Sequence, residues 1–336
     1  MTLRWQHLIP SLTLCLATVA PDAARADCPA DTALIFLVPP EAEAGPEGKA
    51  ARQFADRANA ALAGRHCISL RSDTASADLA AALAAGNASF AALPLDAVAE
   101  VTPALDVINL PFLFDSPHHA LVWAEALPAP SASADTPALL GVLLTGALQM
   151  TAPRALSTPA AVAGLAFAVP STAPVSAATA AALGATAVPV DSTPAAFAAA
   201  LATGTTPASF ATWPVIDFGG LYAAPTVITE TNHGITGAAI LAAPGLIATL
   251  TPDDATLLLD LLRQVLHEQS LLAFETDAIS RQAITEDGGI VVALDPTARA
   301  AFRVALAPIY DAAATRLGRD AINAAVAANA TARPFE

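Results

Sequence analysis

Short apolar segments alternate with helical segments along this chain, and that alternation constrains the fold more than any other feature. A first series predicts strands at 34–38, 68–71 and 89–93 and helices at 48–62 and 77–85. Strands that alternate with helices of this length form parallel βαβ units. The pattern therefore predicts an α/β fold with a largely parallel sheet.

The alternation is repeated further along the chain. A second series predicts strands at 139–144, 165–169 and 186–190 and helices at 173–183 and 193–202. The chain has 336 residues, which is long enough for two domains. Two series of βαβ units in such a length indicate two α/β domains.

Beyond residue 250 the chain becomes strongly helical. Thr251-Pro252-Asp253-Asp254 forms a capping box with proline at the first helical position. Leucines recur at helical spacing from Leu258 to Leu272, which predicts one long helix. A last helix is predicted at 296–317, where Gly318 ends it.

The first 26 residues have the composition of an export signal. Arg4 gives a positive start, and residues 8–20 form an apolar core that is too short to span a bilayer. Ala24-Arg25-Ala26 is the small-x-small pattern that signal peptidase recognises, so cleavage is expected before Asp27. Residues 1–26 are therefore predicted to be a signal peptide, and the mature chain is predicted to be periplasmic.

Two cysteines remain after this cleavage, Cys28 and Cys67. Each stands just before a predicted strand, and neighbouring parallel strands would bring the two residues close together. No Cys-x-x-Cys pair suggests redox chemistry, and an exported chain meets an oxidising environment. We therefore predict one structural disulfide between Cys28 and Cys67.

The charge of the chain excludes several kinds of partner. The formal net charge is −15 at pH 7, and Lys49 is the single lysine. Such a chain is a poor ligand for nucleic acid or for anionic lipid. The mean hydropathy of +0.54 comes mostly from alanine. The longest uncharged stretch, 155–190, is interrupted by several prolines, so we predict no membrane-spanning segment after the leader.

One apolar segment stands out between the two series. Asn109-Leu110-Pro111-Phe112-Leu113-Phe114-Asp115 is interpreted as a strand end that runs into a turn, with its phenylalanines packed around the proline. It resembles the Leu-Pro-Phe-Leu-Phe segment of a known family, the substrate-binding proteins of tripartite ATP-independent periplasmic (TRAP) transporters. Further segments match this family in order and spacing: Asp78-Leu79, Arg154-Ala155-Leu156, Ala163-Gly164-Leu165, Leu183-Gly184-Ala185, Thr231-Asn232-His233, Phe302-Arg303, Pro308-Ile309-Tyr310 and Leu317-Gly318.

This resemblance implies a two-domain periplasmic-binding-protein fold with an interdomain cleft, crossing strands and a long connecting helix. The expected N-terminal lobe comprises 27–145 with part of 210–245, and the expected C-terminal lobe comprises 146–209 with 250–325. The resemblance also implies a small organic ligand, closure by hinge motion, and delivery of the ligand to TRAP permease subunits in the inner membrane.

The chain departs from the family where the family binds a carboxylate. The family's ligand strand carries an arginine that forms a two-pronged ion pair with the substrate, and Ala168 occupies that position here. A second family arginine is also missing from 146–149. Three alternatives remain. The ligand is neutral or cationic and binds in a cleft lined by Phe167, Phe210, Trp213 and Asp78; or Arg154 swings in and takes the role of the missing arginine; or the site is degenerate.

The remaining polar residues give no sign of catalysis. His233 is either a packed polar residue or a ligand contact near the interdomain crossing. His118-His119 and His267-Glu268 lack the spacing of a metal site, and no nucleophile elbow, phosphate loop or dinucleotide fingerprint is present. We therefore expect neither an enzyme nor a cofactor or metal. A sensor that feeds a signalling partner and a binding protein of an ATP-driven importer remain as alternative functions.

Overall fold

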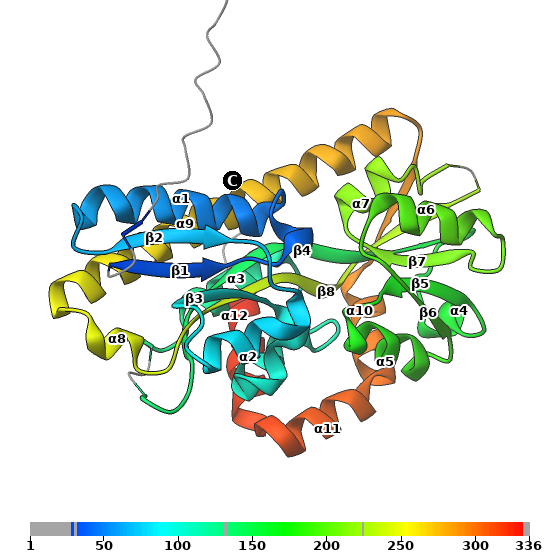
Figure 1. The fold of residues 1–336 in the computed structure, drawn as a ribbon. Coiled ribbons are helices and arrows are strands. Elements are labelled where there is room, and N and C mark those ends of the chain that lie inside the picture. The colour runs from blue at the N-terminus through cyan, green and yellow to red at the C-terminus, as the bar shows by residue number, and fades with distance from the viewer. Residues whose placement is uncertain (1–27, 30–31, 131–132, 224, 332–336) are drawn as a thin grey trace, which may run out of the picture.

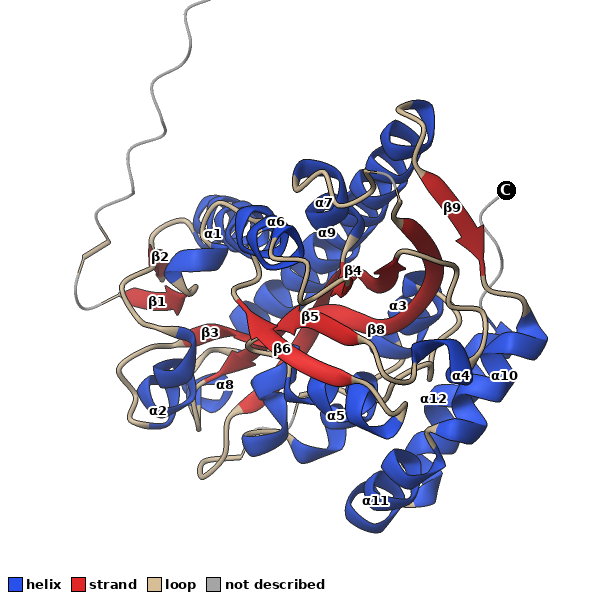
Figure 2. Ribbon diagram, turned by 90° about the vertical axis from the view of Figure 1, so that its right-hand side faces the viewer, coloured by secondary structure: helices blue, strands red, loops and turns tan. Residues whose placement is uncertain are grey.

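A computed structural model describes residues 28–29, 32–130, 133–223 and 225–331. Nine strands form one mixed sheet in the order β2-β1-β3-β8-β4-β7-β5-β6, with β9 beside β8 (Figures 1 and 2). One half of the sheet, here the N-terminal lobe, contains β1 (Ala33–Leu37), β2 (Cys67–Arg71) and β3 (Phe90–Pro94). The other half, the C-terminal lobe, contains β5 (Ala166–Pro170), β6 (Thr186–Val190) and β7 (Ala208–Ala211).

Two long antiparallel strands join the lobes, β4 (Ala138–Ala152) and β8 (Val227–Ala242). Near one end they pair beside β3, and near the other end β4 pairs with β7. Their mutual pairing shifts register between Leu144 and Gly146 and again between Leu148 and Met150. These irregularities fall where the chain passes from one lobe to the other, so they mark the hinge region.

Helices cover both faces of the sheet, and most of them begin with proline in the first turn, where its missing N–H costs no hydrogen bond. The N-terminal lobe carries α1 (Pro46–Leu62), α2 (Leu79–Ala84) and α3 (Pro117–Glu125). The C-terminal lobe carries α4 (Pro159–Val162), α5 (Pro174–Ala182), α6 (Pro194–Ala202) and α7 (Trp213–Phe218). The later helices are α8 (Leu246–Thr249), α9 (Pro252–Glu286), α10 (Pro296–Ala305), α11 (Ala307–Leu317) and α12 (Arg319–Thr331). Short 3₁₀ turns lie at Pro40–Ala42, Ser76–Asp78, Leu95–Glu100 and Pro103–Asn109.

The predicted parallel βαβ units are confirmed. β1 pairs in parallel with β2 and β3, and β5 pairs in parallel with β6 and β7. β4 is much longer than the strand predicted at 139–144, because it continues across the hinge into the C-terminal lobe. β9 (Ile290–Ala293), which lies parallel to the start of β8, was not predicted.

The helix predicted beyond residue 250 is also confirmed. The Thr251 hydroxyl accepts a hydrogen bond from the Asp254 backbone N–H at 3.1 Å, and α9 then runs for 35 residues. It packs against α1 of the N-terminal lobe and α7 of the C-terminal lobe (Figure 1). Arg57 of α1 pairs with Glu268, and Arg281 pairs with Glu230 of β8. Helix α9 therefore packs against both lobes and links them. Within the described residues, no helix is long and apolar enough to cross a membrane.

The prediction for 109–115 as a strand end was wrong. The segment follows a 3₁₀ turn and forms an irregular loop, in which Phe112 adopts a positive φ of 61°. The Phe112 N–H donates to the His233 carbonyl at 2.8 Å, and its ring stacks on Phe302 at 4.8 Å between centroids. These contacts hold a conformation that a bulky residue adopts only under constraint.

Side chains of the C-terminal helices α10 and α11 hold the same loop in place. Arg303 donates from Nε to the Phe112 carbonyl at 2.7 Å, and the Tyr310 hydroxyl donates to the Pro111 carbonyl at 2.8 Å. Asp115 pairs with Arg303 at 2.7 Å. The helix predicted at 296–317 is split at Leu306, because Pro308 stands in the first turn of a new helix. The family-matched segments at 109–115, 302–303 and 308–310, which are far apart in the sequence, therefore contact one another.

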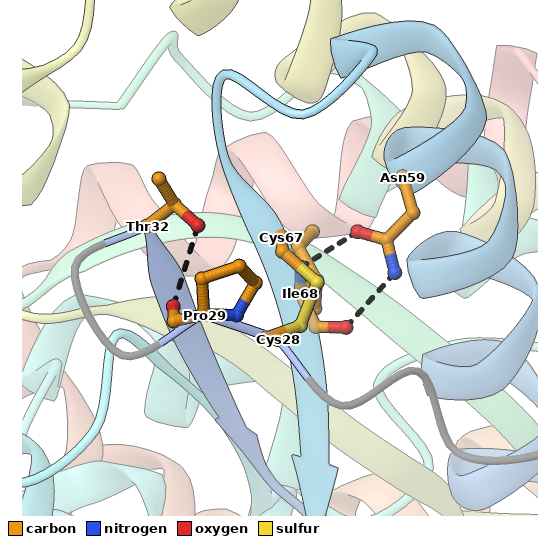
Figure 3. Close-up of a disulfide and its surroundings, with 6 residues drawn as sticks. All are labelled: Cys28, Pro29, Thr32, Asn59, Cys67 and Ile68. Atoms are coloured by element: carbon orange, nitrogen blue, oxygen red, sulfur yellow. Dashed lines mark hydrogen bonds between the residues drawn. A yellow bond between two sulfur atoms is a disulfide. The ribbon is translucent and has the colours of Figure 1, made fainter.

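The predicted disulfide is confirmed. Cys28 and Cys67 are bonded, with their Cα atoms 5.4 Å apart (Figure 3). Cys67 is the first residue of β2 and pairs with Ala33 of β1, so the bond ties the start of the described chain to the neighbouring strand. Next to it, the Asn59 side chain of α1 bonds both the N–H and the carbonyl of Ile68. The predicted signal peptide, 1–26, lies outside the described residues.

Candidate ligand-binding site

A cavity of about 380 Å³ lies where the two lobes meet. Its wall is formed where parallel strands end: Asp96 lies just beyond β3, Thr172 beyond β5, Ser192 beyond β6 and Thr212 beyond β7. The crossing strands contribute Thr145 and Leu148 from β4 and 233–237 from β8. Ligands of open α/β sheets bind outside the carboxyl ends of the strands, and this cavity has that position.

Two carboxylates of the N-terminal lobe line the cavity, Glu47 in the first turn of α1 and Asp96 after β3. Burial raises the pKa of the Glu47 carboxyl above its usual value, although its own backbone N–H acts against this. Burial also raises the pKa of Asp96, with hydrogen bonds from Thr172 and backbone N–H groups opposing it. Neither carboxylate forms an ion pair with any residue that the structure describes.

Asn109 connects the two 3₁₀ turns on this side of the cavity. Its side-chain amide donates to the Leu95 carbonyl at 2.7 Å and to Asp106 at 2.8 Å. Asn109 is buried, and it also lines the cavity. The bond to the Leu95 carbonyl anchors the chain directly before Asp96, which helps to position that carboxylate.

The C-terminal lobe presents a different lining. It offers hydroxyl groups at Thr172, Ser176, Ser192 and Thr212 together with apolar side chains such as Phe197 and Phe210. No lysine or arginine belongs to the lining formed by the described residues. The site can therefore offer hydrogen bonds and apolar contact from both lobes, and negative charge from one of them.

His233 forms the back of the cavity on β8 and is only 2% exposed. Burial, and then the nearby Arg299 charge, lower its pKa to about 3, so the ring is neutral at ordinary pH. Its Nδ1 lies 2.8 Å from the Thr231 hydroxyl, and its ring packs edge-on against Phe210 at 4.3 Å. Nε2 has no hydrogen-bond partner among the described residues. His233 is therefore an uncharged polar group with one ring nitrogen available to a ligand.

The structure brings two of the predicted site residues to the cavity, Phe210 and His233. Phe167, Ala168 and Trp213 do not line it, because they are buried in the core of the C-terminal lobe.

Phe167 packs behind Phe210 at 4.6 Å between ring centroids, and Trp213 lies 5.8 Å from the Arg281 guanidinium. Ala168 is fully buried among Phe197, Trp213 and Ile216.

The two predicted charged residues lie away from the cavity. Asp78 is exposed at the start of α2 and does not belong to the lining. Arg154 donates to the Ala161 carbonyl at 3.0 Å and is exposed. Glu47 and Asp96 were not predicted as site residues. A signal existed for Asp96, since it follows directly after the strand predicted at 89–93, where a parallel sheet places its ligand-binding loops.

No group of three His, Cys, Asp or Glu side chains that could hold a metal ion is present in the described part of the chain. The paired histidines have structural surroundings. Nδ1 of His119 lies 2.7 Å from the Ser116 hydroxyl at the start of α3, and His118 packs edge-on against Phe274. His267 of α9 contacts Glu125 at the end of α3. His118 and His267 therefore join α3 of the N-terminal lobe to α9.

The comparisons with known proteins agree with the fold. The profile of the bacterial extracellular solute-binding protein family 7 (DctP) matches residues 40–316. The C4-dicarboxylate-binding periplasmic protein DctP of Vibrio cholerae is 26% identical over 321 residues, which cover 91% of this chain and 94% of that protein.

Solved structures of TRAP periplasmic solute-binding proteins share the fold. One from Shewanella oneidensis, with bound succinate, has a TM-score of 0.70 and 25% identity, covering 89% of this chain and 99% of that one. One from Ochrobactrum anthropi has a TM-score of 0.75 and 20% identity, covering 89% and 95%. With the profile match over most of the chain, these findings show that this protein belongs to the bacterial extracellular solute-binding protein family 7, the solute-binding proteins of TRAP transporters.

Proposed function

We propose that this protein captures a small organic solute in the cavity between its lobes and delivers it to a TRAP permease in the inner membrane. Export by the predicted signal peptide 1–26 would bring the chain to the periplasm, where such a solute is collected. The family assignment supports this function over a sensor or a subunit of an ATP-driven importer, and it gives no support to a catalytic role. The lobe boundaries expected from the sequence remain part of the proposal.

We further propose that the solute is uncharged or bears an amine. The observation that carries this proposal is the lining: it contains two carboxylates and, among the described residues, no lysine or arginine. A ligand carboxylate placed there would meet negative charge without a cation to balance it, which is costly in a buried site. Arg154 does not relieve this, since it is exposed and bonded to the Ala161 carbonyl.

A carboxylate ligand is the second candidate, because the Vibrio cholerae relative is named for C4-dicarboxylates and the Shewanella oneidensis relative contains succinate. In this chain such an anion would depend on neutral donors. Thr172 and Ser176 at the N-terminal end of α5 are the groups in the lining that suit it best.

A thermal-shift screen with acids, amides, alcohols and amines on matched carbon skeletons separates the two candidates. A ligand that binds the folded protein raises its melting temperature by mass action. We expect stabilisation by alcohols, amides or amines and none by the matched dicarboxylates. Stabilisation by carboxylates alone would establish the second candidate and overturn the first.

Capture itself is tested by scattering. Binding proteins of this kind close about a hinge, so a saturating ligand from that screen is expected to reduce the radius of gyration in small-angle scattering. Absence of any binder in a broad solute library, together with an unchanged radius, would contradict capture between the lobes.

A further inference from the structure

We propose that Glu47 and Asp96 form a cation subsite, and that the solute captured by this protein carries a protonated amine. This inference rests on the proposed function, because it names the chemical class of the ligand in the same cavity. It commits to a cation where the proposed function allows either a neutral or an amine-bearing solute.

The first step is the charge that the lining of the cavity carries. Glu47 and Asp96 come from different segments of the N-terminal lobe and line one cavity of about 380 Å³. Neither has a cationic partner among the described residues, and no cation contributes to the electrostatic surroundings of either group. An ionised carboxylate that is removed from water without a partner is strongly unfavourable. A cation supplied by the ligand would remove this penalty on binding.

The second step is the contrast with acidic residues in and around the N-terminal lobe. Asp254 is buried and pairs with Arg65 at 2.7 Å, Glu268 pairs with Arg57, and Asp73 pairs with Arg71. Arginine lowers the pKa of each of these carboxyls. The two cavity carboxyls show the opposite shift. These three carboxylates are therefore balanced by arginines, whereas the two that line the cavity have no arginine among the described residues.

The third step is the rest of the cavity. His233 is 2% exposed and neutral, and its Nε2 has no partner among the described residues. It can accept or donate one hydrogen bond without adding charge. Phe210 and Leu148 add apolar surface, and the hydroxyls of the C-terminal lobe add further hydrogen-bond capacity. This lining suits a compact amine with a short apolar or hydroxyl-bearing body.

The fourth step connects the subsite to closure. Thr172 of the C-terminal lobe and Asp96 of the N-terminal lobe line the same cavity, and the Thr172 hydroxyl lowers the pKa of Asp96, which favours the ionised carboxylate. An ammonium group on the ligand would favour the same ionised form. Cation binding and contact between the lobes therefore stabilise each other, which links occupancy of the subsite to the closed state.

The experiment is calorimetric titration of the mature protein with α,ω-diamines, amino alcohols, diols and dicarboxylates on three- to six-carbon skeletons. On at least one skeleton we expect the diamine or amino alcohol to bind at least about tenfold more tightly than the diol, with no binding of the dicarboxylate. Amine binding should also release protons at mildly acidic pH, because a bound cation lowers the pKa of its carboxylate partner. Repeating the titration in buffers of different ionisation enthalpy measures this release.

Variants identify the residues. Glu47→Gln and Asp96→Asn should each weaken amine binding at least about tenfold and remove most of the preference for the amine over the diol. Asp78→Asn is the matched control: it removes an exposed carboxylate of the same lobe outside the cavity and should change neither. Equal binding of diol and amine, or amine binding that survives both substitutions, would overturn the subsite while leaving solute capture intact. If no amine binds on any skeleton, the subsite is also overturned, whereas capture fails only if the broad solute library yields no ligand.

Discussion

The two walls of the cavity are built by the same strand-to-helix pattern and differ in their chemistry. In the N-terminal lobe the turns after the strands bring Glu47 and Asp96 to the cavity, and in the C-terminal lobe the equivalent turns bring Thr172, Ser192 and Thr212. The sheet fixes where ligand-contacting residues lie, because parallel strands end along one edge. The residue types at those ends then decide which wall carries charge. Here the N-terminal wall carries the two carboxylates, and the C-terminal wall carries neutral hydroxyl groups.

Between the walls, the crossing strands add polar groups of their own. On the cavity side, His233 is buried and neutral. On the α9 side, Asp277 is 7% exposed and lies against the hinge strand, where a Cβ at Gly146 would come close to its carboxylate. Its Oδ1 has no hydrogen-bond partner in the described structure. The hinge therefore contains a third carboxyl that no arginine balances.

The largest expected effect comes from introducing an arginine at position 168, where the family has one. Ala168 is fully buried among Phe197, Trp213 and Ile216, so Ala168→Arg must place a charged side chain in a packed core. We expect a loss of at least about 4 kcal/mol in the free energy of unfolding, or failure to fold, and no new affinity for succinate. Urea unfolding and a succinate titration measure both. A folded variant of normal stability that bound succinate would show that an arginine at position 168 can give the C-terminal wall a positive charge that binds an anion.

The next effect concerns Asp277, between the two walls. Burial raises the pKa of this carboxyl to about 7. The folded protein therefore retains its proton to a higher pH than the unfolded chain, and stability is lost as the pH rises from about 4 to about 7. The loss persists above pH 7. Asp277→Asn keeps a side-chain oxygen that can accept a hydrogen bond from the Ala147 N–H, and its amide group cannot ionise.

We expect Asp277→Asn to be about 2–4 kcal/mol more stable than the natural protein at pH 8 and nearly equal to it at pH 4. Chemical unfolding across this range measures the difference. The neighbouring strand β4 has no titratable residue, and on β8 Glu230 is paired with Arg281 and His233 is neutral, so Asp277 should dominate this response. A stability difference that does not depend on pH would mean that Asp277 is already ionised in the folded protein.

The strand and helix pattern that the two lobes share could be predicted from the sequence, whereas the surroundings of single residues could not. The parallel units followed from apolar segments bounded by helices, and the disulfide followed from two cysteines placed before neighbouring strands. The residue pattern did not predict β8 as a strand, because polar residues from Thr229 to His233 interrupt its apolar pattern, and only the resemblance to the family implied a crossing strand there. Thr229, Thr231 and His233 are buried where the two strands cross, a tertiary feature that has no local signal.

The site was harder to predict than the fold for a related reason. Phe210 and His233 were expected at the cavity and line it. Glu47 resembles an ordinary surface carboxylate in the sequence, and Asp96 is marked only by its position soon after the strand predicted at 89–93, so the pair becomes visible only when the two lobes are placed together. Ala168 was expected in the cleft through its alignment with the family, but its strand turns that side chain into the core. Periodicity predicts elements, whereas burial of a single charge depends on distant segments.

A smaller effect is expected from adding positive charge to the lining of the C-terminal wall. Thr172 belongs to the cavity lining and bonds Asp96, so Thr172→Arg would place a guanidinium against that carboxylate. It should occupy the cation subsite and weaken amine binding about 10- to 100-fold, with little loss of stability. Titration with the best amine measures the loss. If amine affinity is unchanged, the amine does not bind beside Asp96.

The smallest effect tests the bond between the walls. Thr172→Val preserves shape and removes the hydroxyl that favours ionised Asp96. Loss of one such hydrogen bond is worth about 1 kcal/mol, so amine affinity should fall about fivefold. The pKa of Asp96 should also rise, and amine binding should therefore weaken at a higher pH during acidification than it does in the natural protein. Thr179→Val is the matched control, because Thr179 lines the same wall but donates its hydroxyl within α5, to the Val175 carbonyl at 2.7 Å. Titrations between pH 5 and pH 8 should show the shift in the first variant alone. An equal shift in both would mean that the hydroxyl wall acts as a whole, and that the bond between Thr172 and Asp96 has no special part in joining the two lobes around an amine.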